Sequence, residues 1–443
     1  MNTTDYEHGV VPADQRKGWW SIAAVWIAIG IDLSGAFLGI ELAAGMDFGA
    51  AMLATFVGST LLGLMAMACA YVGAVSGLST AMISRVVFGR IGGAVLAIAL
   101  SLSLLGWFAV QAGFFGSNAQ IAFGELTGLD LPVWIFTLVG GTLMALTALW
   151  GYRSISKLSS LAVPALLVLL LLGVIVGFAT QGTDGLSTPV DVVFTFGGAV
   201  SLVMAIFILG VVTAPDMARW AKTPRQAMAA GFVGFFFGNS IIVVVALVLA
   251  RVMGETELMT IFFLLGLGGA AVIVLILAQW TTNTSNIYSA ALSFASVDGR
   301  LNRRVLTVIG GVVGILIAVL GAADGFIPFI SAIGIVIAPF GGVYVAAFVV
   351  DHRAGRFTPA EQERAVHPLA IAAWAIGIFV ALAATHPADG LGLGLFDLTT
   401  IPALDGLLAG FVAYLVLGLV ARRVRSDAAA PAPAEREPDE VAS

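Results

Sequence analysis

The chain has 443 residues, of which 60% are hydrophobic and 10% are charged, with a formal net charge of −6. An ordinary soluble domain carries about 25% charged residues, so these residues cannot cover a water-soluble surface, and a soluble globular protein is excluded. The single cysteine, Cys69, lies in an apolar run and excludes an intramolecular disulfide and a metal cluster held by thiolates.

Apolar runs long enough to cross a bilayer follow one another along the chain. A helix needs about 20 apolar residues to cross the roughly 30 Å hydrocarbon core of a membrane. By this measure there are twelve runs, and we predict an all-α membrane protein with twelve transmembrane helices. The runs cover 19–44, 48–74, 93–119, 132–152, 155–180, 191–214, 227–250, 260–294, 304–321, 323–350, 366–385 and 400–421.

The basic residues predict the orientation of the chain. When the runs are threaded through a membrane, every Lys and Arg except Arg251 lies on the same side as the two termini. Basic residues in short loops stay in the cytoplasm during insertion, so we expect a cell-membrane protein with both termini cytoplasmic. These residues are Arg16, Lys17, Arg85, Arg90, Arg153, Lys157, Arg219, Lys222, Arg225, Arg300, Arg303, Arg304, Arg353, Arg356, Arg364, Arg422, Arg423, Arg425 and Arg436.

The two ends of the chain differ from the part between them. Residues 1–18 are polar, and we expect a cytoplasmic N-terminal segment that leads into the first apolar run. That run is too long for the core of a signal peptide, so it belongs to the mature protein. The tail over 426–443 is rich in Ala, Pro and Glu, which predicts a disordered cytoplasmic segment.

Two of the apolar runs contain weak helix formers near the depth of the bilayer centre. The first run holds Gly30, Asp32 and Gly35, and the sixth holds Gly197-Gly198 and Gly210 before Pro215-Asp216. Interrupted helices at matching positions of two halves indicate a binding site at the membrane midplane, where freed backbone groups contact an ion and a substrate. The alternative is that these glycines only let helices pack closely.

The remaining function classes are weighed by what each would need. An enzyme needs a cluster of acid, base or nucleophile, but His8, His352, His367 and His386 all fall in termini or loops. A channel would show a repeated polar pore face, and none is seen. A receptor without transport activity stays open as an alternative, although it does not need broken helices. These features favour a secondary transporter and predict that the chain is not an enzyme.

Seven short stretches lie in one order along most of the chain. They are Arg16-Lys17-Gly18, Gly106-Trp107-Phe108, Ala162-Val163-Pro164-Ala165, Thr213-Ala214-Pro215-Asp216-Met217-Ala218-Arg219, Phe237-Gly238-Asn239-Ser240, Trp280-Thr281-Thr282-Asn283 with Tyr288, and Pro339-Phe340-Gly341-Gly342-Val343. Together they resemble the cytosine/purine permeases of the nucleobase:cation symporter family, whose fold is similar to that of the sodium-coupled leucine transporter. The resemblance implies two inverted five-helix repeats over 19–180 and 191–351, with helices 1 and 6 interrupted, and two trailing helices over 366–421. It also implies uptake of a nucleobase-like ring coupled to a cation.

A candidate sodium site lies on the eighth run. Ala278, Thr281 and Thr282 stand at i, i+3 and i+4, so they share one face of a helix. Sodium prefers oxygen ligands, and the resemblance implies the carbonyl of Ala278, the two threonine hydroxyls, and carbonyls of Gly30 and Leu33. The alternative is that each hydroxyl only bonds a carbonyl of its own helix.

Asp32 is a carboxylate inside a membrane helix, which is costly and points to function by default. We expect it to join the ion site, to carry a coupling proton, to pair with a cationic substrate, or to accept hydrogen bonds from the interrupted backbone beside it. Glu41 lies near the outer end of the same run, where water can solvate it. Sodium is favoured over the proton as the coupling ion, and no organic cofactor is expected.

The expected substrate site is built from aromatic rings and amides. The resemblance places Trp107 and Phe207 at the two positions between which the family stacks a planar ring, and stacking selects flat heterocycles. Gln111 lies one turn after Trp107, and its amide both donates and accepts hydrogen bonds. Asn283 and Asn286 are further candidate substrate contacts, although Asn286 is also suited to bridging helices.

The chain departs from the cytosine carriers of the family at three positions. Ile206 and Leu209 stand where those carriers have hydroxyls, and Ala278 stands where they have an amide. Unpaired polar groups on a base cost roughly 1–3 kcal/mol each, so we do not expect tight binding of cytosine. We expect a cation-coupled symporter of a nucleobase-like planar heterocycle, in contact with lipid and without a nucleic acid or obligate protein partner. The alternative is proton-coupled transport of an amine or another cationic or vitamin-like substrate through Asp32.

Overall fold

The computed structural model describes residues 11–150, 152–295, 297, 300–352, 355, 357–358 and 365–428. It leaves the side chains of 13, 150, 152–160 and 421–428 undescribed. The start of the expected N-terminal segment, over 1–10, and most of the expected disordered tail, over 429–443, lie outside these residues. Within the described part the fold is all-helical, with one isolated β-bridge between Lys17 and Ala221.

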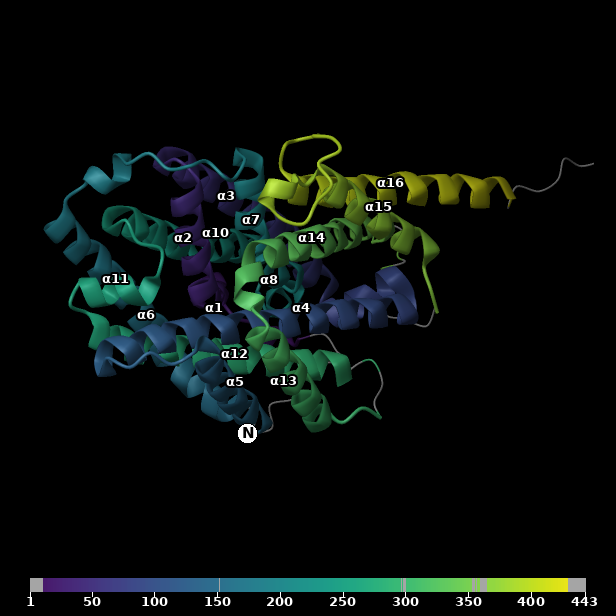
Figure 1. The fold of residues 1–443 in the computed structure, drawn as a ribbon. Coiled ribbons are helices and arrows are strands. Elements are labelled where there is room, and N and C mark those ends of the chain that lie inside the picture. The colour runs from purple at the N-terminus through teal and green to yellow at the C-terminus, as the bar shows by residue number, and fades with distance from the viewer. Residues whose placement is uncertain are drawn as a thin grey trace, which may run out of the picture.

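The first half of the chain forms six α-helices (Figure 1). The first apolar run is divided into two helices that meet at an angle of 57°. The helices are α1 (Trp19–Gly30), α2 (Leu33–Gly45), α3 (Phe48–Ser76), α4 (Thr80–Thr127), α5 (Val133–Trp150) and α6 (Tyr152–Gln181). In α4, the backbone of Gly89 has φ 80 and ψ 175, which only glycine adopts readily, and the helix kinks there.

The second half begins with another divided run. It comprises α7 (Phe196–Ala205), α8 (Ile208–Val212), α9 (Pro215–Ala218), α10 (Pro224–Met253), α11 (Leu258–Leu264), α12 (Gly268–Ala295), α13 (Arg303–Val319) and α14 (Phe326–Asp351). Two helices follow at the C-terminal end, α15 (Pro368–Ala384) and α16 (Pro402–Ala428). Short 3-10 turns precede α1, α7, α14 and α16 at Ala13–Gln15, Asp184–Ser187, Ala322–Gly325 and Pro387–Asp389.

Length and hydropathy single out six described helices that could cross a membrane, or seven if α1 and α2 count as one bent span. The other expected runs fall on helices that are shorter or divided. α7 covers only ten residues, and α15 covers seventeen. The chain is therefore a helical protein with several apolar helices, and the count of twelve spans stays a prediction.

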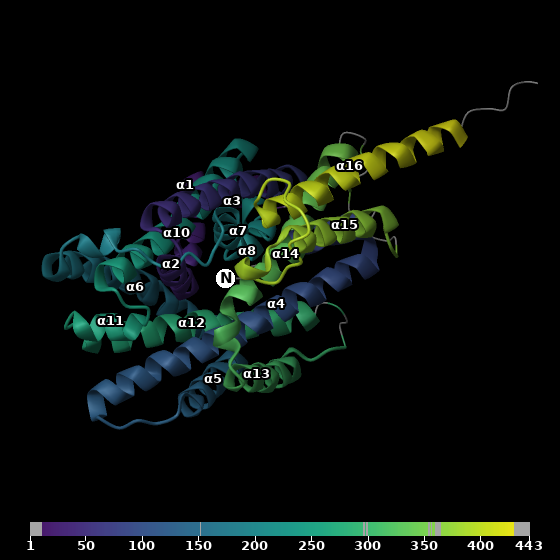
Figure 2. The same cartoon turned by 45° about the horizontal axis from the view of Figure 1, so that its top comes forward.

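The broken helices belong to one of two groups of helices (Figure 2). On one side, α10 packs against α1, α2 and α3, and α3 packs against α7. On the other side, α4 runs beside α12, and α5 and α13 cover these two. α14 contacts both α7 and α8 as well as α4, so it connects the groups. This arrangement places both helix breaks in the interior of the protein.

Arg251 is the basic residue expected on the opposite side of the membrane from all the others. It links α10 to the end of α2 and to the segment before α7 by hydrogen bonds. It lies at the end of α10 and is buried. Its guanidinium donates from Nη1 to the carbonyl of Thr188 at 2.8 Å and from Nη2 to the carbonyl of Met46, the C-cap of α2. The charge therefore satisfies the buried carbonyl at the end of the broken first span and ties the exposed segment at Thr188 to it.

Asp389, in the loop between α15 and α16, holds the start of α7. Its carboxylate accepts hydrogen bonds from the backbone N–H of Thr195 at 2.8 Å and from the Thr195 hydroxyl at 2.7 Å. The Thr195 hydroxyl in turn accepts from the N–H of Gly198, so it caps the helix. Burial raises the pKa of Asp389, and the bonds from Thr195 partly offset this.

The opposite ends of the two broken spans are also joined. The backbone N–H of Lys17 donates to the carbonyl of Trp220 at 2.7 Å, and the N–H of Lys222 donates to the carbonyl of Lys17 at 3.2 Å. The Lys17 ammonium lies 5.9 Å from the centre of the Trp220 ring. The segment that leads into α1 therefore runs beside the segment that follows α9.

Candidate functional site

The break in the first span is shaped by Asp32. α1 ends at Gly30, the Asp32 N–H donates to the Gly30 carbonyl at 2.9 Å, and Ile31 between them has φ −79 and ψ 75, as in an inverse γ-turn. Asp32 is the N-cap of α2, and its Oδ2 accepts from the N–H of Ser34 at 3.2 Å and from the Ser34 hydroxyl. The expected role of supporting the interrupted backbone is thus visible in the structure.

The break in the sixth span falls on Phe207, between α7 and α8, where φ is −118 and ψ is 11. The sequence placed the weak point of this run at Gly197-Gly198 and Gly210, and for the first pair this was wrong. Both glycines lie within the first turn of α7, where the loop after α15 approaches closely. A Cβ at Gly197 would clash with the carbonyl of Thr400, and one at Gly198 would clash with the Asp389 carboxylate.

The two breaks meet at Gly30 and Phe207. A Cβ added at Gly30 would lie 2.7 Å from Cε1 of Phe207 and 2.7 Å from the backbone of Gly238 in α10. Gly30 is therefore needed for close approach, and the ring of Phe207 packs on the backbone of the first break. Phe207 also packs against Phe235 of α10, and the centres of the two rings lie 4.7 Å apart.

Gln111 reaches the same break from α4. Its side chain is 3% exposed, and its Nε2 donates to Asp32 Oδ2 at 3.3 Å. A carboxylate only accepts hydrogen bonds, so the amide must turn its nitrogen toward Asp32 and its oxygen away. That oxygen, Oε1, is buried and has no hydrogen-bond partner in the described part of the chain. Two residues predicted for the substrate site are thus in direct contact.

Trp107 lies one turn before Gln111 and faces α14. Its ring is 6% exposed and meets Phe329 and Phe326 edge-on, with ring centres 5.1 Å and 6.3 Å apart. These contacts are with α14, whereas Phe207 contacts α1 and α10, so the two rings pack against different helices. In the described structure Trp107 is therefore packed rather than free in a cavity.

The predicted sodium ligands of α12 face the interior, and two of them are bonded to each other. The hydroxyl of Thr281 donates to the carbonyl of Ala278 at 3.0 Å, and both residues are buried. The bond uses the hydroxyl proton and leaves the lone pairs of the Thr281 oxygen for a cation. Thr282 is half-buried, and α12 also contacts α2, the helix that begins with Leu33.

The two asparagines predicted as substrate contacts have different surroundings. Asn283 is fully buried and donates from Nδ2 to the carbonyl of Phe108 at 3.1 Å and to Sδ of Met144 at 3.4 Å. It therefore bridges α12 to α4 and α5, which is the role that the sequence suggested for Asn286. Asn286 itself is half-buried.

Sequence reasoning missed Gln279, one residue after Ala278. Its side chain is 1% exposed, and both atoms of its amide are buried without a partner among the described residues. The signal was present, because an amide inside a membrane helix is costly unless it is bonded. Gln279 lies four residues before Asn283 and so shares its face of α12.

The remaining predicted positions are simpler to place. Ile206 and Leu209 are half-buried and flank Phe207 with apolar side chains, as the departures from the cytosine carriers indicated. Glu41 is exposed near Glu257, which fits its expected position at a solvated outer end. No group of three His, Cys, Asp or Glu residues in the described chain is arranged to hold a metal ion.

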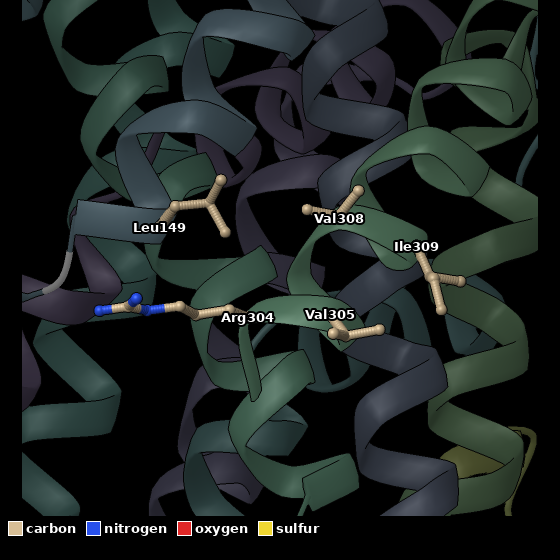
Figure 3. A pocket seen from close by; sticks show the side chains of 5 residues that line it. All are labelled: Leu149, Arg304, Val305, Val308 and Ile309. Atoms are coloured by element: carbon tan, nitrogen blue, oxygen red, sulfur yellow. The ribbon is translucent and has the colours of Figure 1, made fainter. Parts of the chain in front are cut away.

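One groove of about 560 Å³ lies away from these residues, between α5 and α13. It is lined by Leu149 of α5 and by Arg304, Val305, Val308 and Ile309 of α13 (Figure 3). Figure 3 shows the Arg304 side chain extending away from the four apolar ones. The valines and the isoleucine are among the exposed residues of α13, so the groove belongs to the outer surface and not to the site.

A family model and a relative in sequence identify the same family. A family model described as a permease for cytosine/purines, uracil, thiamine and allantoin matches residues 10–407. The cytosine permease of Escherichia coli strain K12 is 30% identical over 423 residues, which are 95% of this chain and 95% of that protein.

Solved structures share the fold at lower identity. An inward-facing structure of Mhp1 superposes with a TM-score of 0.78 at 18% identity and covers 94% of this chain and 93% of that chain. A structure of Mhp1, a nucleobase-cation-symport-1 family transporter, in a closed conformation with bromovinylhydantoin bound gives 0.70 at 18% identity and covers 96% of each chain. The predicted resemblance to the nucleobase:cation symporters, with a fold like that of the leucine transporter, is confirmed. The chain belongs to the family of permeases for cytosine/purines, uracil, thiamine and allantoin, and it is a secondary transporter of the membrane rather than an enzyme.

Proposed function

We propose that the chain imports a planar, nucleobase-like heterocycle together with sodium by alternating access. The observation that carries this proposal is the meeting of the two helix breaks, where Phe207 packs on Gly30 and Gln111 bonds Asp32. A break exposes backbone carbonyls and N–H groups that only a ligand, protein or water can satisfy. Two breaks in contact in the interior therefore favour one shared site for ion and substrate.

The architecture behind this proposal is that of two inverted blocks. We assign 19–180 to the first block and 191–351 to the second, with 366–421 as two trailing spans. Each block begins with a broken span, α1 with α2 and α7 with α8. With twelve spans and the basic residues on one side, both termini lie in the cytoplasm and the protein lies in the cell membrane.

For the substrate we propose contacts with Trp107, Gln111, Phe207 and Asp32. The family description includes cytosine, purines and uracil, and the Mhp1 structure holds a hydantoin, all of them flat rings with polar edges. Phe207 is half-buried beside the break and offers one aromatic wall. Asn283 is assigned to bridging α12 with α4 and α5, because its amide nitrogen is already engaged there.

For the ion we propose the carbonyls of Gly30, Leu33 and Ala278 and the hydroxyls of Thr281 and Thr282. These groups are neutral oxygens, as sodium accepts. The hydroxyl of Thr281 already points its proton at the Ala278 carbonyl, so its oxygen is oriented without competing for the cation. The Gly30 carbonyl lies at the break itself, next to Asp32.

A binding screen on the purified full-length chain tests the proposal. Nucleobases, hydantoins, vitamin-type pyrimidines and amines are each measured with and without sodium. Tighter binding of a planar heterocycle in sodium than in potassium or choline supports sodium symport. Binding of amines alone, or of none of these compounds, contradicts the proposed substrate class.

A second function, proton-coupled transport of an amine, is favoured by Asp32. This carboxylate lies at the break and no basic side chain of the described chain is bonded to it. In that case ligand affinity is unchanged by sodium and varies with pH. Asp32→Asn then abolishes the pH dependence, whereas in the sodium symporter it leaves the sodium dependence in place.

A further inference from the structure

The carboxylate of Asp32 uses only one of its two oxygens. The N–H of Ser34, the hydroxyl of Ser34 and Nε2 of Gln111 all donate to Oδ2. No donor of the described residues reaches Oδ1. An ionised carboxylate can accept at both oxygens, so half of its capacity remains available to a ligand.

Gln111 supplies a second acceptor beside the first. Its Oε1 is buried and unpartnered, and its orientation is fixed because Nε2 must face the carboxylate. A buried acceptor left without a donor is destabilising, so this atom is suited to a group that arrives with the substrate. Asp32 and Gln111 touch each other, and each presents one free acceptor.

Both acceptors lie next to the proposed stacking residues. Asp32 is two residues from Gly30, on which the ring of Phe207 packs, and Gln111 is one helical turn from Trp107. Ile206 and Leu209, on either side of Phe207, add apolar surface without a hydrogen-bonding group. The two free acceptors are therefore the hydrogen-bonding groups nearest in sequence to the residues proposed to hold the ring.

We propose that the substrate carries two adjacent N–H donors on one edge, a ring N–H next to an exocyclic amino group, as in guanine or isocytosine. This inference rests on the proposed function of the site. Such an edge gives a hydrogen of the amino group to the free oxygen of Asp32 and the ring N–H to Oε1 of Gln111, and bonds to a charged acceptor are the stronger kind. Uracil, hydantoin and xanthine place carbonyl oxygens beside their N–H, and these oxygens would face the carboxylate without a donor.

A ligand series on the purified full-length chain in sodium tests this edge. Hypoxanthine differs from guanine only by lacking the amino group, and uracil differs from isocytosine by having a carbonyl in its place. We expect guanine to bind roughly tenfold or more tightly than hypoxanthine, and isocytosine than uracil, as one charge-assisted hydrogen bond requires. Equal or tighter binding of hypoxanthine and uracil overturns the inference while leaving the proposed function intact. If none of the heterocycles binds, the proposed function fails as well.

A variant then assigns the preference to Asp32. Asp32→Asn keeps the size of the side chain and an oxygen for the cap of α2 but removes the charged acceptor pair. We expect the ratio of guanine to hypoxanthine affinity to fall toward one, because the amino group of guanine then loses its charged acceptor. Asp47→Asn, at the N-cap of α3, is the matched control and keeps the ratio of the parent. An unchanged ratio in Asp32→Asn overturns the assignment, and if that variant does not fold the ligand series alone decides the proposal.

Discussion

Asp32 and Gln111 join α2 to α4 by a single hydrogen bond of 3.3 Å at the point where the first span is broken. Asp32 thereby contacts two helices, because it also caps α2 by accepting a hydrogen bond from the N–H of Ser34. The same contact leaves one acceptor free on each side chain. A residue that both shapes a break and faces the site couples the backbone geometry to ligand binding.

Trp107 combines packing with its proposed role in stacking. Trp107→Ala should cost about 3–5 kcal/mol of stability, because the ring fills the space beside Phe326 and Phe329. Trp107→Phe keeps an aromatic face and is the cleaner test. We expect it to stay folded and to bind the heterocycle about tenfold more weakly, within the range of one stacking contact.

Thermal stability without ligand and ligand affinity are measured for Trp107→Phe in the same samples. Trp374→Phe is the control, since Trp374 is a half-buried tryptophan of α15 that donates to the carbonyl of Val336 and lies outside the site. Its affinity should equal that of the parent. Unchanged affinity in Trp107→Phe would remove this residue from the substrate site.

Thr282 tests the ion site without touching the stacking residues. Thr282→Ala deletes one proposed oxygen ligand, so sodium should bind roughly tenfold more weakly. Sodium and substrate must strengthen each other's binding by the same factor, so the sodium dependence of substrate affinity reports the loss. Thr284→Ala is the matched control, because its hydroxyl is buried and donates to the carbonyl of Trp280. The same sodium response in both variants would speak against Thr282 as a ligand.

At the scale of elements, the two helix breaks are formed by different kinds of residue. For this reason the position of the first break could be predicted from the sequence and that of the second could not. The first contains Gly30 and the capping residue Asp32, which are visible in the sequence. The second falls on Phe207, which is not a helix breaker, and it could not be located from local propensity. The pair Gly197-Gly198, which seemed to mark it, serves the approach of Thr400 and Asp389 from a distant segment of the chain.

The same limit applies to the contacts between elements. The sequence singled out Asp32 and Gln111, but their bond joins residues 79 positions apart and depends on how α2 and α4 pack. The bridging role of Asn283 likewise depends on where Phe108 and Met144 lie, which no local pattern shows.

Arg251 is expected to stabilise the outer end of the broken first span. Arg251→Met removes the donors to the carbonyls of Met46 and Thr188, and the buried Met46 carbonyl left unpaired costs about 1–3 kcal/mol. The melting temperature without ligand should fall by several degrees. Arg304→Met, at an exposed arginine of α13, is the control and should change little. Equal melting temperatures of the two variants would contradict the fastening role.

At the scale of the whole molecule, the distribution of Lys and Arg residues predicts how the chain is oriented in the membrane. Of the 20 basic residues only Arg251 is expected on the far side, and there the structure gives it backbone carbonyls to bond. The family and the helical class could be predicted from the sequence because motifs and hydropathy are spread along the chain. The expected number of twelve spans stays a prediction, since length and hydropathy select only six or seven described helices.

Cysteine labelling in intact cells tests the orientation. Leu129 lies in the expected external loop and Leu301 in an expected cytoplasmic one, and both are exposed. A membrane-impermeant reagent should label Leu129→Cys but not Leu301→Cys. The native Cys69 is fully buried and should give little background. Labelling of Leu301→Cys alone would invert the orientation.

Uptake into proteoliposomes tests the central claim most directly. The full-length chain is reconstituted, and accumulation of the heterocycle that binds best is followed with an inward sodium gradient, with equal sodium on both sides, and with a sodium ionophore. The account predicts accumulation that needs the gradient and collapses when the ionophore is added. Accumulation that is the same with and without the gradient, or binding with no uptake under any condition, would contradict it.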